Sequence, residues 1–178
     1  MSTLTVKELS HPAGEVIKIA AGKTLDLNSQ GNVTMPTGSV LQVVSVKYGT
    51  SVTVTSGTYQ DSGLTLSITP TSTNSKIMVL ANVDVRTYDS AFNARADVNL
   101  VRGSTTLNNT FLGLYVNAGT DNNFYAKQDF MHLDSPATTS STTYKVQGKV
   151  SGADTIRFNG DASTFSTITL MEIRVCLA

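Results

Sequence analysis

Few side chains in this sequence could serve as metal ligands or nucleophiles. The two histidines, His11 and His132, are far apart, and neither stands at zinc-ligand spacing from the single cysteine, Cys176. One cysteine excludes a disulfide within the chain and argues against a cysteine-based metal site. We therefore expect structural histidines, Cys176 as a small apolar filler, and folding in a reducing compartment.

Paired carboxylates are a second source of chemistry, because glycan-cleaving enzymes place two acids on either side of the bond that they break. The acidic residues here fall mostly at expected strand ends and turns, where an aspartate caps its own backbone. The segments "DNN" (121–123) and "NGDAS" (159–163) offer oxygen ligands, but neither completes a calcium loop. No nucleophile-elbow pattern is present. The sequence thus predicts a non-enzymatic protein with no catalytic residue, no metal and no cofactor.

Aromatic side chains could stack on a sugar ring. The chain has no Trp, six Tyr and six Phe. Tyr88, Tyr115 and Tyr125 lie near expected loops, which makes them candidate ligand residues. The more common use of such tyrosines is to cover core edges or subunit contacts. A host surface glycan therefore stays open as a ligand.

Composition indicates a β-rich protein without a nucleic-acid or membrane partner. Charged residues make up only 15% of the chain, and its 13 basic and 13 acidic side chains are scattered. The sequence lacks the basic stripe that binds phosphate backbones, and no apolar run is long enough for a membrane helix. Abundant threonine and valine favour half-buried strands. The N-terminus has no continuous apolar segment after its first charges, so we expect no secretory signal.

Residues 1–37 are expected to form an extended arm of short strands rather than a domain. Short apolar clusters alternate there with turn-forming segments such as "SHPAG" and "NSQGN". An extended arm has no second layer to bury these side chains, so another chain or the protein's own trimer must cover them. The candidate anchor residues are Leu4, Val6, Leu9, Val16, Ile17, Ile19, Leu25, Leu27, Val33 and Met35.

Residues 38–178 are predicted to form an all-β, antiparallel sandwich or jelly roll. Alternation with period two is clearest in "KIMVLANVDVR", where Ile77 to Val85 place an apolar residue at every second position. Pro36 and Gly38 predict a turn before the first long strand. The predicted strands, separated by turn-forming segments, lie near 40–47, 52–55, 63–69, 76–86, 94–102, 111–117, 124–134, 142–150, 154–158 and 167–175.

Two stretches resemble a known protein family. "LDLNSQGNVTMPTGSVLQVV", followed by "LTLSITPTSTNSKIMVLANVDVR", is similar to small virion structural proteins of bacteriophages, frequent in marine and cyanobacterial phages. The resemblance covers residues 24–86 well, the closing "ITLMEIRV" moderately, and 87–150 only in β-rich character. It implies an N-terminal arm, a jelly roll of the trimeric tumour-necrosis-factor-like type, and a place in the virion as a head decoration, head fibre or tail fibre protein.

The closing segment "ITLMEIRV" indicates how such a jelly roll could assemble. It carries apolar residues on both faces, as a central strand at a subunit interface would. The candidate residues of a homotrimer interface are Ile168, Leu170, Met171, Ile173 and Val175.

These expectations combine into a non-enzymatic structural protein of a phage virion, assembled in the cytoplasm of the host bacterium. The main hypothesis is a trimeric capsid decoration or cement protein that docks on the major capsid protein through its arm. The alternative is a tail fibre or host-receptor protein, joined to a tail component and able to bind a host glycan. The motifs of the family do not separate its head-bound from its tail-bound members.

Overall fold

The structure is a computed structural model that describes residues 21–22, 35–89, 95–113, 122–151, 155–161 and 163–175. The chain divides into two compact units, Met1–Thr34 and Met35–Ala178. The short strands expected in the arm lie outside the described residues, and so do all the anchor candidates except Met35. The described residues contain no helix, and therefore none that is long and apolar enough to cross a membrane.

The described part of the second unit consists of strands and loops. The strands are β1 (Val40–Tyr48), β2 (Val52–Val54), β3 (Gln60–Ile68), β4 (Lys76–Asp89), β5 (Arg95–Arg102), β6 (Thr105–Gly113), β7 (Asn122–Asp134), β8 (Thr142–Ser151), β9 (Thr155–Phe158) and β10 (Ser166–Ile173). Each predicted strand is present. The largest error is in β6, which was expected from residue 111 but begins at Thr105.

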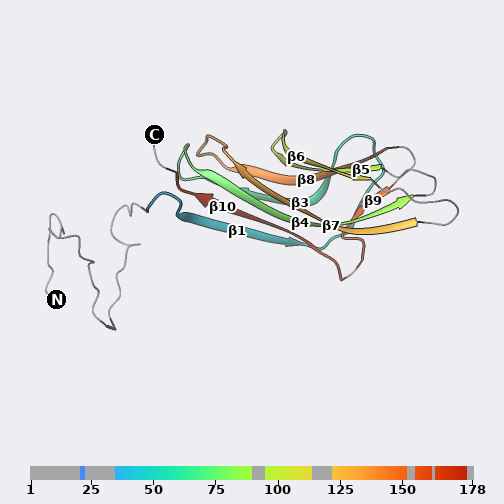
Figure 1. The fold of residues 1–178 in the computed structure, drawn as a ribbon, viewed down its shortest axis with the longest axis horizontal. Helices are drawn as coiled ribbons and strands as arrows, with labels where there is room; N and C mark the ends of the chain where they lie inside the picture. Colours follow the sequence, from blue (N-terminus) through green and yellow to red (C-terminus); the bar gives the residue numbers. More distant parts are fainter. Residues whose placement is uncertain are drawn as a thin grey trace. The chain divides into compact units, whose positions relative to one another are not determined.

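The strands form two antiparallel sheets that pack face to face (Figure 1). In sheet A, β1, β10, β4 and β7 are neighbours in that order. The short strand β9 pairs with the C-terminal part of β4, and β2 pairs with β9. In sheet B the order is β3–β8–β5–β6. Strands that follow one another in the chain are thus divided between the sheets as in a jelly roll. The predicted all-β, antiparallel jelly roll is confirmed.

The core lies between the two sheets and is built from alternating residues. The side chains of β4 from Ile77 to Val85 that were predicted to share a face are buried. Val98 and Leu100 of β5, together with Ile168 of β10, are fully buried in the same cluster. Burying each such aliphatic side chain contributes about 1.5–3 kcal/mol, so this cluster is the main source of stability.

A tight turn leads into β1. The backbone N–H of Ser39 donates to the carbonyl oxygen of Pro36 at 3.1 Å, and Gly38 has φ +86°. A positive φ at the third residue is typical of a type II turn and favours glycine there. The N–H of Gly38 also donates to the carbonyl oxygen of Arg174 at 2.7 Å. The turn expected from Pro36 and Gly38 is therefore present and hydrogen-bonded to the end of β10.

A buried polar cluster links the two sheets at one end of the sandwich. Arg102 Nη1 of β5 donates to both carboxylate oxygens of Asp134 on β7, at 2.6 and 2.7 Å. The hydroxyl of Tyr144, on β8, donates to the same carboxylate at 2.7 Å. Burial, and then the Asp134 carboxylate, raise the pKa of Tyr144 far above its ordinary value. One aspartate of sheet A thus holds two strands of sheet B.

A second buried carboxylate joins β10 to β1 and to the loop before β4. Glu172 is fully buried, and its Oε2 accepts a hydrogen bond from Gln42 Nε2 at 2.6 Å. Its Oε1 accepts from the backbone N–H and the hydroxyl of Thr71, at 2.8 and 2.7 Å. Burial by itself raises the pKa of Glu172, but hydrogen bonds from Ser75, Thr71 and Gln42 outweigh it and hold the pKa below its usual range.

Acid should weaken the body through Glu172. A lowered folded-state pKa adds stability that is fully present above the ordinary glutamate pKa of about 4.3 and is lost as pH falls through the folded pKa. The unfolding free energy of Glu172→Gln should therefore be lower than the parent's near neutral pH and fall less steeply in acid. Urea titrations at a series of pH values below about 4.3 measure how steeply the unfolding free energy of each protein falls as the pH is lowered. An equal pH dependence in the parent and in Glu172→Gln would contradict this role of Glu172.

Candidate functional site

An apolar patch lies on the outer face of sheet A. It is formed by Val43, Met78, Leu80, Met131, Leu133 and Met171. Four of these residues form one continuous row of paired neighbours, which runs from Val43 through Met171 and Met78 to Leu133. Leu80 and Met131 are paired in the second row. The strand register therefore gathers side chains from β1, β10, β4 and β7.

The patch is open to solvent in the single subunit. Met131 is 73% exposed, Val43 54% and Leu133 47%. Burying such side chains is favourable by roughly 25 cal/mol per Å² of apolar surface. Contiguous exposed apolar surface on a folded domain marks an interaction site more often than a free surface.

Polar and charged residues border the patch on the same face of sheet A. Asn82 donates to Asp129 Oδ1 at 2.5 Å, and Lys127 Nζ lies 3.2 Å from Asp84 Oδ2. Lys47 Nζ lies 3.7 Å from the centre of the Phe165 ring. An apolar centre with a polar border is the usual composition of a protein–protein interface.

The candidate residues of the trimer interface fall into two groups in the structure, one in the core and one on the surface. Ile168 and Leu170 are fully buried in the core of their own subunit, so a partner cannot reach their side chains. Met171 and Ile173 alternate with them and lie on the outer face of sheet A, where they are partly exposed. Val175 is partly exposed beyond the end of β10. The two-sided apolar pattern of β10 thus serves one core face and one outer face.

Two of the three candidate ligand tyrosines lie on the paired strands β4 and β7. Tyr125 lies within β7, as the predicted strand 124–134 has it, is 54% exposed, and has Arg86 Cζ 4.6 Å from its ring centre. Tyr88 lies within β4, which continues to Asp89, past the predicted strand end at residue 86. Tyr115 lies outside the described residues.

The described residues hold no group of three histidine, cysteine or acidic side chains that could bind a metal ion. His132 is partly buried in β7, whereas His11 and Cys176 lie outside the described residues. The carboxylates Asp134 and Glu172 take all their hydrogen bonds from structural partners.

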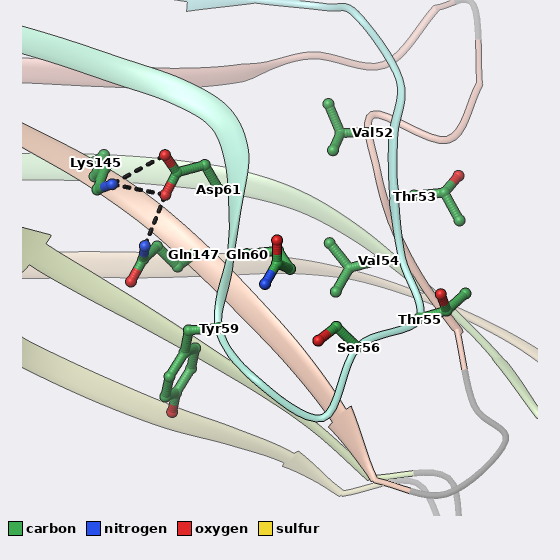
Figure 2. Close-up of a pocket in the computed structure, with 10 residues that line it drawn as sticks. All are labelled: Val52, Thr53, Val54, Thr55, Ser56, Tyr59, Gln60, Asp61, Lys145 and Gln147. Carbon is green, nitrogen blue, oxygen red and sulfur yellow. Dashed lines mark hydrogen bonds and ion pairs between the residues drawn. The ribbon is translucent and has the colours of Figure 1, made fainter.

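A polar pocket of about 780 Å³ lies around the start of β3 (Figure 2). Residues 52–56 line one side, and Tyr59, Asp61 and two side chains of β8 line the other, with Gln60 between them. This volume is within the range of small-ligand sites, about 300–1,000 Å³. We call it the β3 pocket. No local motif in the sequence marks it.

Asp61 is the central charged group of the β3 pocket. Its Oδ1 accepts from Gln147 Nε2 at 2.7 Å, and its carboxylate is 2.8 Å from Lys145 Nζ (Figure 2). Burial raises the pKa of Asp61, but hydrogen bonds from Lys145 and Gln147 and the Lys145 charge bring it below its usual value. The β3–β8 register is irregular between Asp61 and Thr65, where Gly63 has φ +84°. This bulge shapes β3 next to the pocket.

No protein-family model matches the chain, and no curated protein matches it. Among solved structures, the chain is similar to a chain of the T13 viral particle of infectious bursal disease virus, at 12% identity and a TM-score of 0.32, over 88% of this chain and 40% of that one. The VP2 subviral particle of the same virus gives 14% identity and a TM-score of 0.34, over 88% and 42%. The chain thus spans about two fifths of the length of these chains. These TM-scores are too low to assign function, so the surfaces of this chain carry the proposal below.

Proposed function

We propose that this protein is a non-enzymatic structural subunit of a bacteriophage virion, and that it acts as a homotrimeric capsid decoration or cement protein. The observation that carries the proposal is the apolar patch, which leaves Met131 73% exposed in the single subunit. The jelly-roll body and the sequence resemblance to phage virion proteins support the same role.

The patch favours a second copy of the same chain as its partner. It extends across sheet A from one edge strand, β1, to the other, β7, so a neighbour that packs there also reaches both edges. Three subunits that turn these faces toward a common axis form a closed ring and leave no patch uncovered. Sheet B then faces outward, away from the axis.

The arm provides attachment to the particle in this proposal. Residues 1–37 are rich in short apolar clusters, which can add as strands to edges or grooves of the major capsid protein. Three arms per trimer strengthen attachment through effective concentration.

Deleting residues 1–37 tests this role of the arm. The truncated protein should remain folded and trimeric but should no longer co-sediment with particles that lack the protein. Light scattering gives the mass, and sedimentation with purified particles gives the binding. Full-length Tyr125→Ala, altered only on the surface of the body, is the matched control. Binding by the truncated protein as strong as that of the control would contradict arm-based docking.

A tail fibre or host-receptor protein is the second candidate, and the polar β3 pocket favours it. In that case the arm would join a tail component, and the body would present sheet B to the host surface. Labelled antibodies against the body, viewed on intact particles by electron microscopy, distinguish the two because they mark either the head or the tail.

A further inference from the structure

A row of polar side chains crosses the outer face of sheet B and begins in the β3 pocket. Asp61 on β3 pairs with Gln147 on β8, Gln147 pairs with Asn99 on β5, and Asn99 pairs with Asn109 on β6. We call these four residues the polar row. It holds one carboxylate and three carboxamides side by side, which together can both donate and accept hydrogen bonds.

One member of the polar row has unused hydrogen-bonding capacity. Asn99 is 1% exposed, yet its side-chain Oδ1 has no hydrogen-bond partner in the described part of the chain. Its neighbours Val98 and Leu100 are in the core, so Asn99 faces the outer side of sheet B. A buried oxygen without a hydrogen-bond partner is unfavourable, and a hydroxyl donor would remove that cost.

Tyr59 connects the β3 pocket to the far end of the polar row. It lines the pocket, and its hydroxyl accepts a hydrogen bond from Asn109 Nδ2 at 2.9 Å. Lys149 Nζ lies 4.7 Å from the centre of its ring. A fixed aromatic ring beside carboxamides offers both an apolar face and polar partners.

The charges around the row are balanced in pairs. Lys145 lies 2.8 Å from Asp61, and Lys149 lies 3.3 Å from Asp97. These two ion pairs leave no excess charge among the four side chains, so the site does not favour an anion. The chemistry suits a neutral ligand with many hydroxyl groups and one apolar face.

We propose that the β3 pocket and the polar row bind a neutral oligosaccharide. The Asp61 carboxylate accepts from one sugar hydroxyl, and the Gln147 carboxamide donates to an adjacent one. Asn99 Oδ1 is covered in the free protein, so a further hydroxyl, or a water that it holds, donates to it only after the side chains above it move. Tyr59 packs against the apolar face of a sugar ring. The proposal stands apart from the trimer and the arm, because none of its residues belongs to the apolar patch or to the arm. Tyr59 and the polar row lie in the loop before β3 and in sheet B, and β2 with the two residues after it forms the other wall of the pocket.

Titrations of the full-length protein with defined sugars test the site. The neutral probes are linear oligomers of glucose, mannose, galactose and N-acetylglucosamine, and the acidic probe is a galacturonate oligomer. We expect at least one neutral probe to shift the side-chain amide signals of Asn99, Asn109 and Gln147 in ¹H–¹⁵N NMR spectra. Calorimetry should show binding of that probe about tenfold or more weaker for Asp61→Ala, Tyr59→Ala and Gln147→Leu.

Control variants on sheet A show whether a loss of sugar binding is specific to the proposed site or follows from any change of the surface. Tyr125→Ala and Asp129→Ala remove exposed side chains of β7 and should leave binding unchanged. Gln147→Leu keeps the size of the side chain, and an unfolding midpoint equal to the parent's shows that its fold is intact. The proposal is overturned if no neutral probe binds, if only the acidic probe binds, or if Gln147→Leu binds as tightly as the parent.

Discussion

Replacing Met131 and Leu133 by aspartate should turn the proposed homotrimer into monomers with a nearly unchanged unfolding midpoint. Both side chains are exposed in the single subunit, at 73% and 47%, so their carboxylates stay in water when the subunit is alone. In the trimer the same changes remove apolar contacts and bury unpaired charges, which costs several kcal/mol per subunit. Association should weaken by about 100-fold or more, and sedimentation equilibrium over a range of concentrations measures it.

Thr106→Asp is the matched control for this double variant. Thr106 is exposed on β6, an edge strand of sheet B, so the variant adds a carboxylate to a strand outside the proposed interface. It should remain trimeric. A monomeric parent protein, or a double variant that remains a trimer, would show that the patch does not hold subunits together.

Asp134→Ala should lower the free energy of unfolding by about 3–5 kcal/mol. The substitution leaves the Tyr144 hydroxyl without its partner in a residue that is fully buried. It also removes the carboxylate from the Arg102 guanidinium, whose side chain is only 27% exposed. Partial hydration of Arg102 places the expected loss toward the lower end of this range. Urea denaturation followed by circular dichroism measures it.

Two further variants show which part of that loss belongs to the buried cluster. Tyr144→Phe removes a single hydrogen bond and should cost about 1–1.5 kcal/mol. Asp129→Ala, on the same strand, removes an exposed carboxylate with a hydrogen bond to Asn82 and should cost less than about 1 kcal/mol. If Asp134→Ala is no more destabilising than Asp129→Ala, the cluster does not hold the sheets together.

The strands could be predicted because their physical signals are local. Alternation with period two and turn-forming residues act over a few neighbouring positions, and the core face of β4 followed directly. β6 was placed too late because its first residues, "TTLNNT" (105–110), are mostly polar and show no apolar alternation. A hairpin through Gly103 pairs these residues with β5 even so.

The candidate surfaces could be predicted only in part, because strand register decides them. Met78 and Leu80 alternate with the core residues of β4, but nothing in that segment shows that Leu133 and Met131 lie beside them. Similarly, both faces of β10 are apolar, so the sequence alone could not show that Ile168 faces the core and Met171 the outside. The polar row depends on the β5–β6 hairpin and on two pairings between strands far apart in the sequence, β3 with β8 and β8 with β5.

The turn before β1 determines where mechanical load enters the body. Tension carried along the backbone from residue 34 enters the body at Met35 and reaches the Gly38 turn, whose N–H donates to the carbonyl oxygen of Arg174. From there it reaches the β1–β10 ladder, because β10 is the strand that pairs with β1 in the described part of sheet A. Force along β1 is shared by the whole ladder, whereas force across it opens one pair at a time. The resistance of the body to a pull through this turn therefore depends on the direction of the force.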